Sequence, residues 1–244
     1  MNIKHTNDKK YFFCDVHTHI LPEMDDGAYN LWEATQLLDM LIDEGVHEVC
    51  FTPHYYAFEE TVDRYLARRD KRIELIQPHV EKRQLKTTTG SEIYLCEELF
   101  DCKSLEGLNY KDTEYILLEF PYQKLTYETI DLLEQFCIQF PFRPILAHID
   151  RYELFTNNSL RKHCRDLGCL FQMNLDALSS SRKMVRQAVK LIKKGEIDCF
   201  GTDCHNVIWR RPVVQQHLHK LAAAGLRDEL ESIYASNLRW FNFD

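Results

Sequence analysis

Short apolar runs alternate along the chain with longer amphipathic stretches. The apolar runs predict seven buried strands, at Tyr11–Val16, Val46–Thr52, Lys86–Tyr94, Glu114–Phe120, Arg143–His148, Cys169–Asn174 and Ile197–Thr202. Between most of them, helical spacing predicts helices at Leu31–Glu44, Glu60–Glu81, Tyr127–Phe140, Ser159–Leu167 and Arg182–Lys194, and two terminal helices follow at Pro212–Ala224 and Leu226–Tyr234. Strands that alternate with helices imply a parallel sheet.

The number of predicted strands narrows the fold further. Seven parallel strands fit a closed or nearly closed (β/α) barrel better than an open sheet. The first helix has a plausible C-terminal cap at Gly45. No long linker, repeat or low-complexity segment interrupts the pattern. We therefore expect one α/β domain over residues 1–244, with a polar N-terminal extension at residues 1–10.

Composition excludes several classes of protein. Apolar residues make up 45% of the chain, charged residues make up 28%, and the net charge of -8 comes without a Lys/Arg block, which argues against nucleic acid as a partner. No stretch approaches the roughly 20 apolar residues that span a bilayer. Met1–Lys10 is polar and has no apolar signal region. We expect a cytoplasmic protein without membrane insertion.

The nine cysteines are scattered, and no C-x-x-C pair occurs. This excludes the common zinc-finger and thioredoxin patterns. An odd number of cysteines without a secretion signal indicates reduced thiols in a reducing compartment, most of them small core residues.

Ionisable side chains recur at one end of nearly every predicted strand. They are His17, His19, His54, Glu92, Glu119, His148, Asp203 and His205, and Asp26 joins them as a ninth candidate. In a barrel, the C-terminal ends of the strands converge on one mouth, where such enzymes carry out their chemistry. Buried ionisable groups are costly unless something compensates their charge, and metal ions are the natural counterpart.

The spacing of these residues supports a metal site. Residues two apart in an extended strand point to the same side, so His17 and His19 can reach one metal, and Asp203 and His205 repeat this geometry. Carboxylates and imidazoles without cysteine favour manganese, iron or zinc. Nine ligands exceed the needs of one ion, and a cluster of two or three metals suits phosphate ester hydrolysis. We assign surface or packing roles to His5, His47, His79, His163, His217 and His219.

A competing hypothesis comes from the C-x5-R spacing of Cys204 and Arg210, which is typical of cysteine-dependent tyrosine phosphatases. The same spacing occurs a second time by chance, from Cys137 to Arg143, and the first segment has no glycine to open a phosphate-cradling loop. The metal hypothesis is therefore favoured.

Six segments carry a resemblance to a known family. They are D-V-H-T-H-I-L-P-E-M-D-D-G-A at 15–28, T-P-H at 52–54, G-S-E-I-Y at 90–94, L-L-E-F at 117–120, A-H-I-D-R-Y at 147–152 and G-T-D-C-H-N at 201–206. With them the chain resembles the polymerase and histidinol phosphatase (PHP) superfamily, specifically its bacterial protein-tyrosine phosphatases of the CpsB/YwqE type. The resemblance implies a distorted, TIM-like (β/α)7 barrel with three divalent metals, commonly manganese, held by the nine residues above.

The resemblance also implies roles for single residues. Glu92 would bridge metals and Arg151 would contact phosphate. The family's second phosphate-binding arginine aligns with Arg210 without a gap. Its neighbour Arg211 is the alternative, because it precedes Pro212 as the family's arginine precedes a proline.

The activity that the resemblance implies is hydrolysis of protein phosphotyrosine by a metal-activated hydroxide, without a cysteinyl intermediate. The substrate would be the tail of a bacterial tyrosine kinase that controls capsule or exopolysaccharide synthesis. Two alternatives stay open: a small-molecule phosphoesterase, such as a histidinol-phosphate phosphatase, and a non-catalytic metal-binding regulatory module. The oligomeric state is not predicted.

Overall fold

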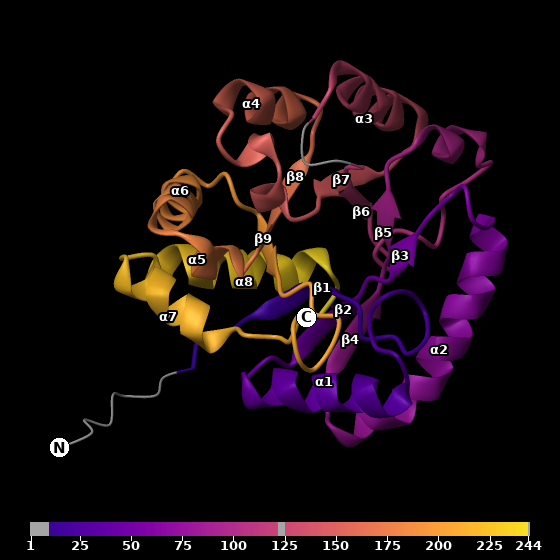
Figure 1. Cartoon of the computed structure of the whole chain (residues 1–244), viewed down its shortest axis with the longest axis horizontal. Helices are drawn as coiled ribbons and strands as arrows, with labels where there is room; N and C mark the ends of the chain where they lie inside the picture. Colours follow the sequence, from indigo (N-terminus) through magenta and orange to yellow (C-terminus); the bar gives the residue numbers. More distant parts are fainter. Residues whose placement is uncertain (1–9, 122–124, 244) are drawn as a thin grey trace.

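Parallel strands form the centre of the computed structural model, which describes residues 10–121 and 125–243 (Figure 1). Within these residues the strands are β1 (Cys14–Thr18), β2 (Glu48–Phe51), β3 (His54–Tyr55), β4 (Lys86–Thr89), β5 (Glu92–Tyr94), β6 (Tyr115–Glu119), β7 (Arg143–Leu146), β8 (Leu170–Asn174) and β9 (Cys199–Gly201). Every pairing between them is parallel. The prediction of an α/β fold around a parallel sheet is confirmed.

The strands belong to two sheets that curl toward each other. One sheet has the order β1-β2-β4, and the other has the order β3-β5-β6-β7-β8-β9. Beyond β9 the two sheets meet, because Asp203 N donates to His17 O at 2.8 Å and His19 N donates to Cys204 O at 2.9 Å. The result is a curled parallel sheet whose strand ends gather on one side.

The predicted strand Lys86–Tyr94 is divided in the structure. Its first half is β4 and its second half is β5, and the two halves belong to different sheets. The division falls at Gly90 and Ser91, where Gly90 N donates to Phe51 O at 2.9 Å and Glu92 N donates to Pro53 O at 3.0 Å. The chain thus changes sheets immediately before Glu92.

Helices cover the outside of the sheets (Figure 1). They are α1 (Leu31–Asp43), α2 (Val62–Lys82), α3 (Tyr127–Gln139), α4 (Asn158–Asp166), α5 (Ala177–Ser180), α6 (Arg182–Lys193), α7 (Gln215–Ala223) and α8 (Arg227–Trp240), with short 3-10 turns at Glu97–Asp101, Ile149–Arg151 and Glu153–Phe155. All seven predicted helices are present, and α8 runs several residues further than expected.

Local signals explain where α1 begins and ends. The Asn30 side chain accepts a hydrogen bond from Glu33 N and caps the N-terminus. Gly45 follows the last turn with a φ of +77°, and its N–H donates to Ile42 O at 2.8 Å, as the sequence predicts. Leu37, Leu38 and Leu41 are fully buried, so the apolar face of the helix packs against the sheet.

The state of the cysteines and the apolar length of the helices can also be read from the structure. All nine cysteines are free thiols. Among the described helices, none is both long and apolar enough to cross a membrane.

Candidate metal centre

The nine predicted ligands come together on one side of the curled sheets. His17 lies in β1, His54 begins β3, Glu92 begins β5 and Glu119 ends β6. The other five lie in loops that follow strands: His19, Asp26, His148, Asp203 and His205. Most of these side chains are buried, and Asp26 is the exposed exception. Residues far apart in sequence thus form one cluster of imidazoles and carboxylates.

Glu92 lies at the centre of this cluster. Its Oε2 is 3.0 Å from His17 Nε2, 3.1 Å from His19 Nε2 and 3.1 Å from His54 Nδ1. Its Oε1 is 2.8 Å from His148 Nε2. One fully buried carboxylate therefore contacts four imidazoles.

Three overlapping groups of donor atoms can each surround one ion. They are His19–Asp26–His54–His205, His17–His19–Glu92–Asp203 and His54–Glu92–Glu119, and the donor atoms within each group lie within 4.8 Å of one another. His19, His54 and Glu92 each belong to two groups. Nitrogen and carboxylate oxygen donors without thiolate fit manganese, iron or zinc. Because they share members, the three groups found among the described residues form one continuous cluster.

Neighbouring side chains fix how two of the imidazoles present their nitrogens. His17 Nδ1–H donates to Gln172 Oε1 at 3.2 Å, and His19 Nδ1–H donates to Asp25 Oδ2 at 2.7 Å. The other nitrogen of each ring, Nε2, then faces the cluster, where the two Nε2 atoms are 3.1 Å apart. In their deprotonated form, two nitrogens placed in this way could bind the same cation.

Several buried polar atoms in the cluster have no partner in hydrogen-bonding geometry, even where an ionic contact lies close by. They are His54 Nδ1, Glu92 Oε2, His148 Nδ1, Asp203 Oδ1 and His205 Nε2. Buried polar groups are rarely left unsatisfied in native proteins, and each such group costs about 1–3 kcal/mol. Four of the five are donor atoms on residues of the three groups, so the residues present fit divalent cations.

Contacts within the cluster shift the pKa values of Glu92 and His19. Burial alone would raise the pKa of Glu92, yet His17, His54 and His148 hold it well below its ordinary value. Burial alone would lower the pKa of His19, but Asp25 and Glu92 raise it well above the ordinary value. Metal binding would displace such imidazole protons, because a histidine ligand must be neutral.

The backbone is strained at two members of the cluster. His148 has a φ of +28° and Asp203 has a φ of +53°, a region that side chains other than glycine rarely adopt. Such strain persists where the surrounding structure imposes it, and it concentrates at functional sites. Gly27 packs closely against the backbone of His19, where an added Cβ would lie only 2.1 Å from His19 O. The loop that carries Asp26 can approach His19 only with glycine at this position.

Two arginines lie at the edge of the cluster. Arg151 forms an ion pair through Nη2 with Asp203 Oδ2. Arg210 Nη2 lies 2.7 Å from the other oxygen of the same carboxylate, Asp203 Oδ1. Both arginine side chains are about one-third exposed, at 36% and 37%. Arg211 is exposed and has no ion pair within the described chain. All three line a pocket of about 210 Å³ next to the cluster, but only Arg151 and Arg210 contact a candidate ligand.

Sequence reasoning missed the side chains that support the cluster. Asp25 lies beside the predicted Asp26 and accepts hydrogen bonds from His19 Nδ1 and from His54 N at 2.8 Å. Gln172 Oε1 accepts from both His17 Nδ1 and His148 N, the latter at 2.6 Å. Two polar residues within the buried strand β8, Gln172 and Asn174, were the available signal.

We expect Asp25→Asn to weaken divalent metal binding by about 10- to 100-fold without unfolding the chain. An amide at this position can still accept a hydrogen bond, but it does not polarise the His19 ring as a carboxylate does. The measurement is a metal titration of the chelated protein. As the control, Asp112→Asn removes a carboxylate from the exposed loop before β6 and should leave the affinity unchanged. Equal affinities for wild type and Asp25→Asn would contradict the supporting role.

Cys204 lies in the same loop as Asp203 and His205 but is buried, with 1% of its surface exposed. Burial raises the pKa of its thiol well above the ordinary value, and Asp15 raises it further. A thiol that stays protonated is a poor nucleophile. The geometry therefore does not favour the cysteine-dependent hypothesis.

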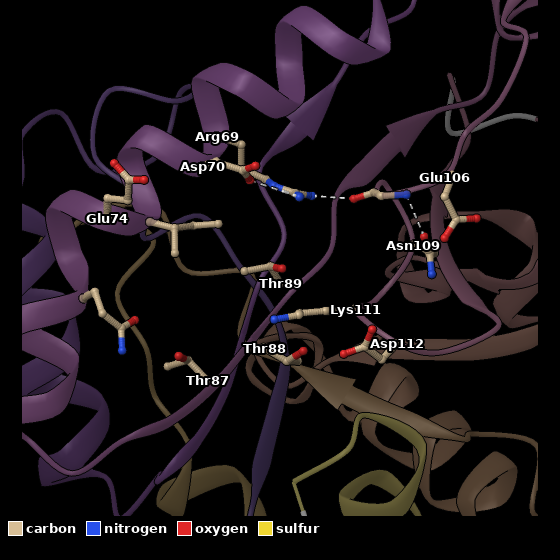
Figure 2. A pocket seen from close by; sticks show the side chains of 13 residues that line it. Arg69, Asp70, Glu74, Thr87, Thr88, Thr89, Glu106, Asn109, Lys111 and Asp112 are labelled. Carbon is tan, nitrogen blue, oxygen red and sulfur yellow. Dashed lines mark hydrogen bonds and ion pairs between the residues drawn. The ribbon is translucent and has the colours of Figure 1, made fainter.

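A pocket of about 630 Å³ lies between α2 and β4 and includes none of the nine candidate ligands. Figure 2 shows Arg69 reaching from α2 toward the segment that carries Asn109. Arg69 Nη1 donates to Gly107 O at 2.7 Å and to Gly90 O at 3.2 Å. This buried arginine ties α2 to the point where the chain changes sheets, so we assign it a structural role.

Other histidines have the packing and surface roles that the sequence suggests. His163 pairs with Glu134 at 2.7 Å on the surface, and the His219 ring meets Tyr11 edge-on with centroids 5.0 Å apart. His217 is buried in α7. His5 lies outside the described residues.

Comparison with known proteins gives concordant matches over nearly the whole chain. The family model described as "Capsular polysaccharide synthesis, CpsB/CapC" matches residues 13–240. Tyrosine-protein phosphatase YwqE of Bacillus subtilis (strain 168) is 28% identical over 85% of this chain and 83% of its own length. Tyrosine-protein phosphatase CpsB of Streptococcus pneumoniae is 26% identical over 92% of this chain and 96% of its own length.

A solved structure shares the fold. It comes from the crystal structures of YwqE from Bacillus subtilis and CpsB from Streptococcus pneumoniae, described as unique metal-dependent tyrosine phosphatases. The TM-score is 0.73 at 24% identity, with 94% of each chain covered.

Proposed function

The chain belongs to the CpsB/CapC family of capsular polysaccharide synthesis, and we propose that it is a metal-dependent phosphatase that hydrolyses phosphotyrosine on protein. The observation that carries the proposal is the set of three overlapping donor groups at the strand ends. Relatives from Bacillus subtilis and Streptococcus pneumoniae that are named tyrosine-protein phosphatases support the choice of reaction.

The proposed cofactor is a set of three divalent ions, with manganese favoured and iron or zinc as alternatives. The three donor groups would hold one ion each. Glu92 belongs to two of these groups, so its carboxylate would serve as a ligand to two ions. His148 would complete the set through Nε2, which lies 3.4 Å from Glu119 Oε1. Bound there, divalent cations supply positive charge to phosphoryl oxygens and acidify water.

Arg151 and Arg210 would bind and orient the phosphoryl group. Both are held by Asp203 and both keep part of the guanidinium exposed. A guanidinium can donate two parallel hydrogen bonds to phosphoryl oxygens, so it fixes their orientation as well as offsetting their charge. Arg210 is preferred to Arg211 because it contacts Asp203.

We expect Cys204→Ser to retain most of the phosphatase activity. The thiol is buried and protonated, and no step of the proposed reaction uses it. The measurement is steady-state turnover of a phosphotyrosine peptide, together with metal content. Loss of turnover in a variant that keeps its metals would contradict the metal-dependent mechanism.

The proposal includes one domain built as a distorted (β/α)7 barrel. The bridge between Thr18 and Cys204 joins the first strand to the segment after the last. Between the two sheets, β2 continues into β3 and β4 continues into β5. Each of these two pairs of short strands would correspond to one strand of a regular barrel. The two sheets would then be the two parts of one barrel.

The proposed substrate is phosphotyrosine on the tail of a bacterial tyrosine kinase that controls capsule or exopolysaccharide synthesis, which places the enzyme in the cytoplasm. The description of the family supports the link to capsule synthesis. The alternative of a small-molecule phosphatase is disfavoured, because the matched relatives are named for tyrosine-protein phosphatase activity. A silent binding module is disfavoured because all nine candidate ligands are retained in one cluster.

Hydrolysis of a phosphotyrosine peptide and of histidinol phosphate, each with and without manganese, tests the proposal. We expect manganese-dependent release of phosphate, with the peptide as the better substrate by kcat/KM. Preference for histidinol phosphate would overturn the assignment of substrate, and activity that is unaffected by chelation would overturn the metal dependence.

A further inference from the structure

Three aromatic side chains stand beside the metal centre and have no part in it. Tyr56 follows His54 by two residues, Phe58 lies two residues further on, and Tyr94 is the last residue of β5. We refer to Tyr56, Phe58 and Tyr94 as the aromatic wall. Each belongs to a segment that also carries, or pairs with, a candidate metal ligand.

Ring contacts connect the wall to the cluster without a break. The Tyr56 ring stacks on the His54 ring with centroids 5.4 Å apart and an angle of 28°. The centroid of the Tyr56 ring also lies 5.5 Å from that of Phe58 and 5.6 Å from that of Tyr94. The Phe58 and Tyr94 rings meet edge to face, with centroids 6.0 Å apart. The wall therefore begins at a candidate ligand and leads away from it.

The sheet register places the wall on one side of the centre. Tyr94 pairs with Glu119 across β5 and β6, and Leu95 N donates to Glu119 O at 2.9 Å. Tyr94 is thus level with Glu119, which shares a donor group with His54 and Glu92. Arg151 and Arg210 both contact Asp203, and Arg210 Nη1 also lies 3.8 Å from Asp26 Oδ2, in a donor group that contains His54. The centre therefore has aromatic rings beside His54 and guanidinium groups beside Asp203.

Phe58 is 52% exposed. An exposed phenylalanine alone is not unusual, but this ring packs against two further aromatic rings and with them offers a continuous apolar surface beside a polar site. Its neighbours Tyr56 and Tyr94 are partly buried.

We propose that the aromatic wall receives the phenyl ring of phosphotyrosine and so determines the preference of this site for aryl over alkyl phosphate esters. This inference rests on the proposed function. A phosphoryl group held by the arginines would have its ester substituent on the side of the wall. An aryl substituent gains stacked or edge-to-face contacts there, whereas an alkyl substituent gains little.

The test compares a phosphotyrosine peptide with a phosphoserine peptide of the same sequence on the manganese-loaded protein. We expect Phe58→Ala to raise the KM for the phosphotyrosine peptide by about 3- to 10-fold, while kcat and the phosphoserine reaction change little. Phe58→Trp should restore the KM. The matched control is Phe12→Ala, because Phe12 is 71% exposed and stacks on Tyr234 at 5.4 Å, before β1 and thus at the opposite end of the strands.

A binding measurement keeps the test independent of turnover. Wild type should bind phenylphosphonate more tightly than methylphosphonate, and Phe58→Ala should lose this difference. Trp209 is a second exposed aromatic residue, and it lines the pocket that contains Arg151 and Arg210. An unchanged preference in Phe58→Ala, or its loss in Trp209→Ala instead, would overturn the role of the wall. A wild type that binds phenylphosphonate preferentially but does not hydrolyse the phosphotyrosine peptide would support the wall and overturn the proposed function.

Discussion

A Glu92→Gln variant is expected to lose on the order of a thousandfold in phosphatase turnover. Glu92 is fully buried, contacts four imidazoles and belongs to two of the three donor groups. A neutral amide of nearly the same shape keeps the packing but removes the charge that would hold two cations together. Turnover and metal content are measured on the same sample, and both should fall.

The control for this variant is Glu106→Gln, which removes a carboxylate from the exposed edge of the large pocket near α2. It should retain full turnover and metal content. If Glu92→Gln kept its activity while remaining folded, Glu92 would not be a ligand and the three donor groups would not form one centre.

An Arg151→Ala variant is expected to keep its fold and metal content while losing about tenfold to a thousandfold in turnover. The guanidinium lies beside Asp203 with about a third of its surface exposed, in position to bind a phosphoryl group over the cluster. Arg151→Lys should recover only part of the loss, because an ammonium group cannot form the two-pronged contact. Steady-state kinetics on a phosphotyrosine peptide measure the effect.

The two neighbouring arginines provide the comparison for Arg151. Arg210→Ala should lose turnover in the same range, because Arg210 contacts Asp203 at 2.7 Å. Arg211→Ala should change turnover by less than about threefold, since the side chain contacts no candidate ligand. The reverse order for Arg210 and Arg211 would assign the second phosphate contact to Arg211. Unchanged turnover in Arg151→Ala would remove the role of Arg151.

Much of the candidate site was predictable because strand geometry is regular. Side chains two apart in a strand share one side, so the pattern of His17 and His19 already implied a shared target. The carboxyl ends of parallel strands meet, so polar residues at the ends of separate apolar runs implied one cluster. This reasoning joins residues from His17 to His205 without any knowledge of their distances, whereas Asp26 depends on the family resemblance.

Features that depend on irregular backbone were not predictable in the same way. The apolar pattern of Lys86–Tyr94 does not show that the chain changes sheets at Gly90. Strand periodicity does not apply within the loop after β1, so it could not reveal that Asp25 supports His19 while Asp26 faces His205. Gln172 resembles an ordinary polar residue in a strand until its contacts to His17 and His148 are known.

The most direct test of the account is a titration of manganese into the chelated protein, in which bound metal and phosphotyrosine hydrolysis are measured on the same samples. The three donor groups predict that activity is absent without metal and returns as up to three ions bind per chain. Full hydrolysis of the phosphotyrosine peptide by metal-free protein would contradict the central claim.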